Sequence, residues 1–143
     1  MIRSFHIGVK ALIVKEGKVL VLKEKDIRGT GDEIYDLPGG RIEDEESPEE
    51  TLGREIKEEL GVENFEIKDL FLASKYEHYS KDGISYMALF YHVDIEDTEI
   101  KLSDEHFSYE WIDGNDLERI ALNREKMHKD FRRAIEIALK DFK

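Results

Sequence analysis

The chain has 143 residues, of which 40% are hydrophobic and 39% are charged, and it carries a net charge of −12. This length suffices for one buried core, so we expect a single domain over residues 1–143. The acidic balance argues against nucleic-acid polymers and anionic membranes as partners, and the absence of cysteine excludes disulfides, thiol catalysis and cysteine-ligated metals.

Two β-rich runs open the chain, at residues 5–14 and 19–23. The polar stretch Lys15-Glu16-Gly17-Lys18 between them predicts a hairpin. Residues 25–33 are polar, contain two glycines and show no periodicity, which indicates a loop. A short strand is expected at residues 34–37, ending before Pro38.

Residues 47–60 predict an α-helix with well-defined ends. Ser47 is followed by Pro48 and, three residues on, by Glu50, which is a capping box with proline at the first helical position. Gly61 directly follows the helix as a left-handed C-cap. The apolar stripe that we expect to be buried recurs every four residues, at Leu52, Ile56 and Leu60.

The arc of this helix next to the apolar stripe is acidic. Glu55, Glu58 and Glu59 stand at i, i+3 and i+4, a spacing that brings side chains together on one helix face. Three carboxylates so close repel one another unless cations lie among them, and oxygen ligands favour Mg²⁺ or Mn²⁺ over zinc. We expect Arg54 to pair with a nearby carboxylate, the candidates being Glu46, Glu50 and Glu58.

The remaining sequence predicts strands at residues 65–79, 84–94 and 108–112, with a second hairpin turn at 80–83. A short helical turn is expected at 117–120 and a final amphipathic helix at 124–142. The buried stripe of that helix would be Met127, Phe131, Ile135, Ala138 and Phe142. This mixture of elements indicates an α+β fold with a mixed sheet.

The segment from residue 40 to residue 62 resembles the signature of the Nudix hydrolases. That signature is glycine, five residues, glutamate, seven residues, Arg-Glu, an aliphatic residue, any residue, Glu-Glu, any residue, glycine and an aliphatic residue. The flanking Leu37-Pro38-Gly39 and Glu105…Trp111-Ile112 are also common in the family, whereas Glu45 departs from it, because relatives often carry glycine there. All nine defined positions are filled, by Gly40, Glu46, Arg54, Glu55, Ile56, Glu58, Glu59, Gly61 and Val62.

The resemblance implies an α/β/α sandwich in which the box forms a loop–helix–loop catalytic motif. It also implies a hydrolase, dependent on Mg²⁺ (or Mn²⁺), that cleaves a diphosphate linkage in a nucleoside diphosphate derivative. The family's metal ligands fall on Gly40, through its carbonyl, and on Glu55, Glu58 and Glu59, with Glu58 or Glu59 as the general base. The family's orienting ion pair falls on Arg54 with Glu46, and Glu105 is a candidate for a further catalytic carboxylate.

The substrate is a separate question. Our first expectation is a nucleoside triphosphate cleaved to a monophosphate and pyrophosphate. A proline that marks many ADP-ribose hydrolases is replaced by Glu77, whereas Tyr79 falls where dinucleoside polyphosphate hydrolases carry a tyrosine, so the latter come second. Tyr35 is a candidate for base stacking, with strand packing as the alternative, and Arg28 for phosphate binding, with plain solvation as the alternative.

Two other function classes are compatible with such a fold. One is a nucleotide-binding sensor without catalysis, which usually has a degraded box or an added DNA-binding domain. The other is an isoprenoid diphosphate isomerase, which needs a cysteine that this chain lacks. We therefore expect a small-molecule nucleotide as partner, a monomer or homodimer, and a cytoplasmic location, since no apolar run or signal-peptide pattern is seen. The five histidines show no metal-ligand spacing.

Overall fold

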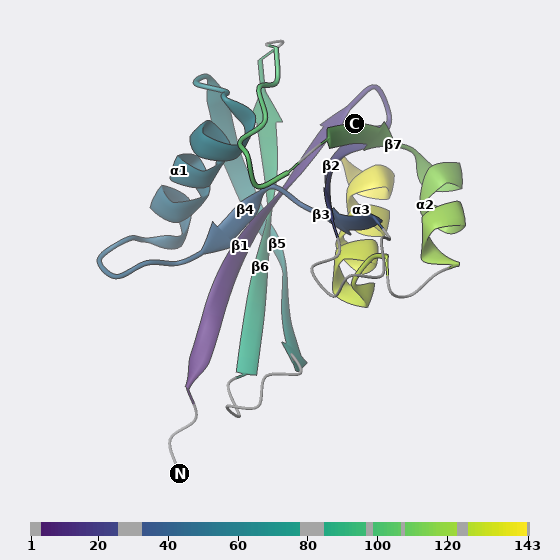
Figure 1. The fold of residues 1–143 in the computed structure, drawn as a ribbon. Helices are drawn as coiled ribbons and strands as arrows, with labels where there is room; N and C mark the ends of the chain where they lie inside the picture. The colour runs from purple at the N-terminus through teal and green to yellow at the C-terminus, as the bar shows by residue number, and fades with distance from the viewer. Residues whose placement is uncertain are drawn as a thin grey trace.

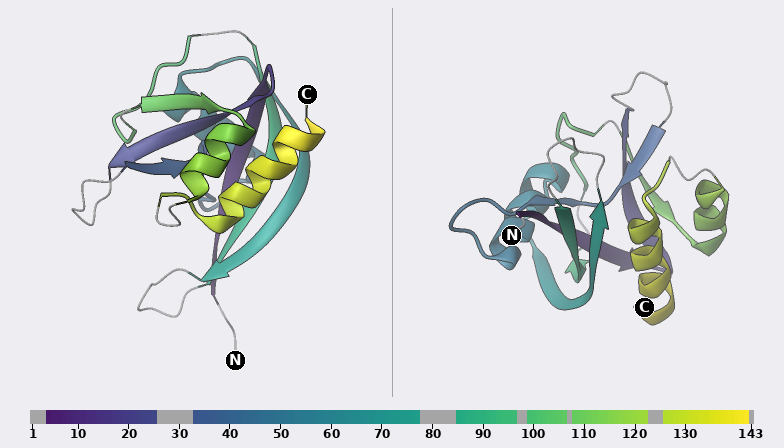
Figure 2. Two further views of the ribbon diagram at one scale, coloured as in Figure 1. Left: turned by 90° about the vertical axis from the view of Figure 1, so that its right-hand side faces the viewer. Right: turned by 90° about the horizontal axis from the view of Figure 1, so that it is seen from below.

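The computed structural model describes residues 4–25, 33–77, 85–96, 99–106, 108–122 and 126–142. A β-sheet lies between helices on its two faces (Figure 1). Helix α1 (Pro48–Leu60) covers one face, and α3 (Lys129–Asp141) covers the other with α2 (Gly114–Ala121) beside it (Figure 2). This arrangement confirms the expected α/β/α sandwich.

The sheet is mixed and is built around β1 (Phe5–Lys15), which runs parallel to β6 and antiparallel to β2 and β4. The strand order is β3-β2-β1-β6-β5, while β4 pairs with β1 and β7 with β2. The other strands are β2 (Lys18–Lys25), β3 (Glu33–Asp36), β4 (Gly39–Arg41), β5 (Phe65–Glu77), β6 (Ser85–Ile95) and β7 (Ser108–Ile112).

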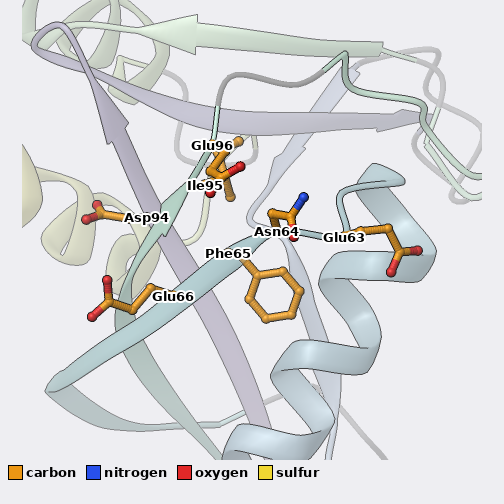
Figure 3. A pocket seen from close by; sticks show the side chains of 7 residues that line it. All are labelled: Glu63, Asn64, Phe65, Glu66, Asp94, Ile95 and Glu96. Atoms are coloured by element: carbon orange, nitrogen blue, oxygen red, sulfur yellow. The ribbon is translucent and has the colours of Figure 1, made fainter.

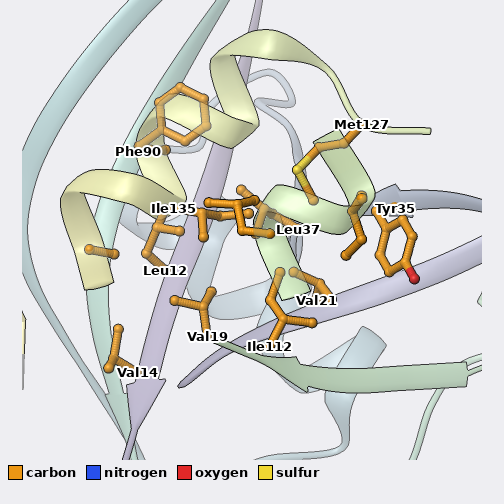
Figure 4. Close-up of a cluster of buried hydrophobic side chains, with 14 of the residues drawn as sticks. Leu12, Val14, Val19, Val21, Tyr35, Leu37, Phe90, Ile112, Met127 and Ile135 are labelled. Atoms are coloured by element: carbon orange, nitrogen blue, oxygen red, sulfur yellow. The ribbon is translucent and has the colours of Figure 1, made fainter. Parts of the chain in front are cut away.

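Side chains of β1 and β2 alternate between two apolar cores, as the period of two in a strand requires. One set, which includes Val9, Ile13 and Leu20, packs against α1. The other set, which includes Leu12 and Val21, packs against α3 (Figure 4). The predicted stripe of α1 is fully buried in the first core, at Leu52, Ile56 and Leu60.

The predicted hairpin between β1 and β2 is confirmed. Lys15 pairs with Lys18, and the two residues between them, Glu16 and Gly17, have φ of 51° and 74°. Positive φ at both positions is the geometry of the two-residue turn that matches strand twist. Residues 26–32 of the predicted loop and the predicted hairpin turn at residues 80–83 lie outside the described residues.

Two element predictions need correction. The final helix begins at Lys129 and not at residue 124, because the His128 side chain caps it by accepting the Asp130 N–H at 3.1 Å. The Lys126 carbonyl also accepts the Tyr35 N–H at 2.8 Å, so the chain there is tied to β3. Strand β4 was not predicted, because glycine-rich segments are seldom recognised as strands.

No helix in the described part of the chain is long and apolar enough to cross a membrane.

Candidate active site

The helix that carries the acidic face has the ends that the sequence predicts. The Ser47 hydroxyl accepts the Glu50 N–H at 3.1 Å, and the Glu50 carboxylate accepts the Ser47 N–H at 3.2 Å. At the other end Gly61 has a φ of 65° and donates its N–H to the Lys57 carbonyl at 3.0 Å. The capping box and the left-handed C-cap therefore fix where α1 begins and ends.

The two glycines before the helix make close approaches, to the backbone of β1 at Gly39 and to the Glu55 side chain at Gly40. Gly39 has a φ of 146°, and a Cβ there would lie 1.9 Å from the Val9 carbonyl oxygen across the β1–β4 pairing. A Cβ on Gly40 would lie 2.5 Å from Oε1 of Glu55. The backbone of Gly40 thus lies close to the Glu55 carboxylate, and the role of its carbonyl as a metal ligand stays a prediction.

Arg54 is the hub of the ion pairs on α1. Its Nε and Nη2 donate to the two carboxylate oxygens of Glu46 at 2.9 and 3.0 Å. Its Nη1 donates to Glu55 at 3.0 Å and to Glu58 at 3.3 Å. The hydrogen bond from Arg54 lowers the pKa of Glu46, and the same bond raises the pKa of Arg54. Glu50, the third candidate partner, is engaged in the capping box instead.

Glu59 is the buried member of the acidic face, with 3% of its surface exposed. Burial, followed by a hydrogen bond with Glu55, raises the pKa of Glu59 to about 9. Its Oε2 has no hydrogen-bond partner among the described residues. A buried carboxylate oxygen without a partner costs free energy, and a cation between Glu59 and Glu55 would remove that cost. The donor set of these residues therefore fits a hard divalent cation.

A second polar cluster lies beside this helix, and sequence reasoning missed it. The segment at residues 99–106 is anchored to the end of α1, because Lys101 N–H donates to the Leu60 carbonyl at 2.8 Å and Ser103 N–H to the Glu59 carbonyl at 3.2 Å. This anchoring brings His106 toward β2 and β3. No spacing signal could reveal the cluster, since its members come from four separate segments: Lys10, Glu24, Asp36 and His106.

Ion pairs and hydrogen bonds tie the cluster together. The Lys10 ammonium donates to Oδ1 of Asp36 at 3.0 Å and to the Leu37 carbonyl at 3.3 Å. The imidazole Nε2 of His106 lies 3.3 Å from Oδ2 of Asp36. Burial by itself raises the pKa of Asp36, but the charge of Lys10 and the hydrogen bonds from His106, Lys10 and Leu37 outweigh it and lower the pKa to about 2.

The remaining predicted site residues lie in different surroundings or outside the described residues. Glu105 is exposed and lies close enough to Glu24 for its charge to contribute to the raised pKa of Glu24. Tyr35 is 6% exposed and belongs to the core under α3, with the Lys23 ammonium 5.4 Å from its ring centroid. Packing therefore accounts for Tyr35 better than base stacking does. Arg28 and Tyr79 lie outside the described residues.

A pocket of about 320 Å³ lies near the site, beyond the C-terminal end of α1 (Figure 3). It contains none of the box glutamates, and one of its carboxylates, Asp94, is already paired with Lys68 at 2.7 Å. The pocket is lined by Glu63, Asn64, Phe65, Glu66, Asp94, Ile95 and Glu96.

Comparison with known proteins agrees with this geometry. The family model of the NUDIX domain matches residues 4–135. The chain is 32% identical over 128 residues to an ADP-ribose pyrophosphatase of Methanocaldococcus jannaschii, covering 89% of this chain and 73% of that protein. It is 31% identical over 119 residues to the nucleoside triphosphatase NudI of Escherichia coli, covering 78% of this chain and 84% of that protein.

Solved structures show the same fold. The MutT protein from Methanosarcina mazei Go1 superposes with a TM-score of 0.76 at 29% identity, over 100% of this chain and 99% of that one. The E. coli ORF135 protein gives a TM-score of 0.75 at 21% identity, over 97% of this chain and 93% of that one.

Proposed function

The chain belongs to the Nudix hydrolase family, and from that premise we propose that it hydrolyses a nucleoside triphosphate to a monophosphate and pyrophosphate with Mg²⁺ (or Mn²⁺) as cofactor. The observation that carries the metal dependence is the buried Glu59 oxygen without a partner, beside Glu55 and the Gly40 backbone. The chain is a Nudix pyrophosphohydrolase by family; the substrate and the ion are our proposal.

Each box residue has a role in this proposal. The Gly40 carbonyl, Glu55, Glu58 and Glu59 would hold the cations, which polarise the diphosphate and stabilise the charge that develops as the bridging oxygen leaves. Glu58 or Glu59 accepts the proton of the attacking water. Arg54, held bidentately by Glu46, keeps the carboxylates of Glu55 and Glu58 oriented.

The choice of a triphosphate is supported by the names of two similar proteins. NudI is named a nucleoside triphosphatase, and the M. mazei structure a MutT protein. ADP-ribose is the second candidate, because the M. jannaschii relative is an ADP-ribose pyrophosphatase, although this chain has Glu77 where many such enzymes carry proline. The proposal of a dinucleoside polyphosphate as substrate is supported by Tyr79 alone.

A single domain, a monomeric or homodimeric state and a cytoplasmic location stay predictions from the sequence.

Product analysis tests the substrate. The purified protein would be incubated with Mg²⁺ or EDTA against nucleoside triphosphates, ADP-ribose, diadenosine polyphosphates and nucleotide sugars. Pyrophosphate released from a triphosphate, only with the cation, is the expected result. Selective cleavage of ADP-ribose or of a diadenosine polyphosphate would replace our substrate class. No turnover together with retained nucleotide binding would favour the sensor.

Glu58→Gln tests the catalytic role of the helix. Glu58 has a side chain 58% exposed, so the substitution should leave the unfolding temperature near that of the wild type. We expect turnover to fall by about 100-fold or more, which steady-state kinetics at saturating Mg²⁺ would show. Glu136→Gln, an exposed glutamate of α3, is the matched control. A Glu58→Gln protein with full activity would contradict the assignment.

A further inference from the structure

Three metal-ligand side chains meet beside the box without using any glutamate of α1. Glu24 comes from β2, Asp36 ends β3, and His106 lies in the segment anchored to α1. One ligand atom from each lies within 4.8 Å of the others. The His106 Nε2 is 3.3 Å from Oδ2 of Asp36 and 3.9 Å from Oε2 of Glu24.

The orientation of each group is set by its neighbours. The Lys10 ammonium and the Leu37 N–H occupy Oδ1 of Asp36, at 3.0 and 2.8 Å. Oδ2 is therefore left to face the imidazole. The side chain of His106 is 4% exposed, and its Nε2 edge is aimed at the two carboxylates. Its other nitrogen, Nδ1, has no hydrogen-bond partner in the described part of the chain.

Simple hydrogen bonding explains only part of this arrangement. A His106–Asp36 hydrogen bond accounts for those two residues, but it does not account for a second carboxylate drawn against the first. Burial and then the charge of Asp36 raise the pKa of Glu24 and outweigh the opposing charges of His106 and Lys10, so the convergence is unfavourable for ionised carboxylates. A divalent cation among the three groups would reverse that repulsion.

We propose that Glu24, Asp36 and His106 form a second metal site, separate from the box, for a divalent transition-metal ion such as Zn²⁺. One imidazole with two carboxylates suits Zn²⁺ better than Mg²⁺ and leaves a fourth position for water or a ligand. Tetrahedral ligands at about 2.1 Å from zinc lie roughly 3.4 Å apart. The His106–Asp36 separation of 3.3 Å already meets this value, and the His106–Glu24 separation of 3.9 Å exceeds it by about 0.5 Å. The proposal does not depend on the hydrolase activity.

Zinc binding in a protein with a disabled box tests the proposal. In the background Glu58→Gln/Glu59→Gln, isothermal titration with Zn²⁺ should retain one binding event. Adding His106→Gln or Glu24→Gln should weaken that event at least tenfold, because an amide is a poor zinc ligand. Adding His6→Ala or Glu33→Gln, which remove matched residues outside the cluster, should leave it unchanged. Circular dichroism would verify that each variant is folded.

Two outcomes would overturn the site. One is a folded box-disabled protein that binds no Zn²⁺, and the other is an unchanged affinity after His106→Gln. If the variants do not fold, anomalous diffraction from wild-type crystals soaked in Zn²⁺ decides the question. A peak within bonding distance of Glu24, Asp36 and His106 supports the proposal, and peaks confined to the box glutamates contradict it.

Discussion

At the residue scale, Glu45 shows how one backbone angle can matter before the catalytic helix begins. Its φ is 72°, in the left-handed region that side chains with a Cβ rarely adopt. This is the position at which the sequence departs from the family's frequent glycine. The structure therefore keeps the conformation that glycine would favour, and the exposed glutamate carries a strain that glycine would not.

The strain at Glu45 gives a stability prediction. Glu45→Gly should be more stable than Glu45→Ala by about 0.5–1 kcal/mol, because only glycine adopts positive φ without a steric cost. Urea unfolding of the two variants measures the difference. Glu63 is an exposed residue with negative φ. There Glu63→Gly should be less stable than Glu63→Ala, since glycine only increases the conformational entropy of the unfolded chain. The same order at both positions would contradict the explanation.

Arg54 gives a prediction about activity. Arg54→Lys keeps the positive charge but replaces the planar fork that holds both oxygens of Glu46 with a single ammonium. We expect turnover to fall at least tenfold, because Glu55 and Glu58 lose their common orienting partner. Kinetics at saturating Mg²⁺ would show the change. Arg132→Lys, in an exposed pair with Glu136, should be neutral, and equal activities of the two variants would argue against the orienting role.

At the scale of elements, α1 depends on its caps as much as on its buried stripe. The helix has one fully buried apolar face, but its acidic residues place like charges on adjacent turns. The capping box and the glycine C-cap supply backbone hydrogen bonds at both ends. Because the same helix carries the carboxylates, its caps set the position of the site relative to the Gly39–Gly40 turn.

Removal of the N-cap tests this dependence. Ser47→Ala should lower the free energy of unfolding by about 1 kcal/mol, since the Glu50 N–H loses its acceptor. Chemical denaturation measures the loss. Ser47→Thr keeps the hydroxyl and is the matched control, with a much smaller expected effect. An alanine variant as stable as the threonine variant would show that the cap contributes nothing.

At the scale of the whole molecule, the box and the neighbouring Glu24–Asp36–His106 cluster are assembled from segments that lie far apart in the sequence. The turn between β3 and β4, helix α1 and the segment at residues 99–106 meet because α1 packs on the sheet and the segment is bonded to its end. The assembly concentrates acidic groups, and its stability should therefore respond to pH and to cations together.

The pH dependence follows from Glu59. Its pKa is about 9 in the folded, metal-free protein and about 4.5 when unfolded, so the folded state binds more protons between these values. Stability from this group is complete below pH 4.5 and is lost as the pH rises toward 9. With EDTA, urea unfolding should show a lower free energy at pH 9 than at pH 6, and Glu59→Gln should remove that difference. Saturating Mg²⁺ should also restore the free energy of unfolding at pH 9. If the free energy of unfolding falls between pH 6 and pH 9 by the same amount in the Glu59→Gln variant, the assignment is contradicted.

Local patterns were sufficient for much of the fold and for the box. Helix α1, its caps, the first hairpin and most strands agree with prediction, because turns, caps and helix faces depend on residues within a few positions of one another. The family signature belongs to the same class, since Glu55, Glu58 and Glu59 share one helix face by spacing alone.

The sequence by itself determined the family, the box helix with its caps, and the first hairpin. Only the tertiary structure decided which carboxylates Arg54 holds, that Tyr35 is packed into the core, and where α3 begins. It alone brought His106 to Asp36, 70 residues away in sequence. Such contacts depend on strand pairing and on the anchoring of one segment to a distant helix, and neither is encoded in the spacing of the residues that meet.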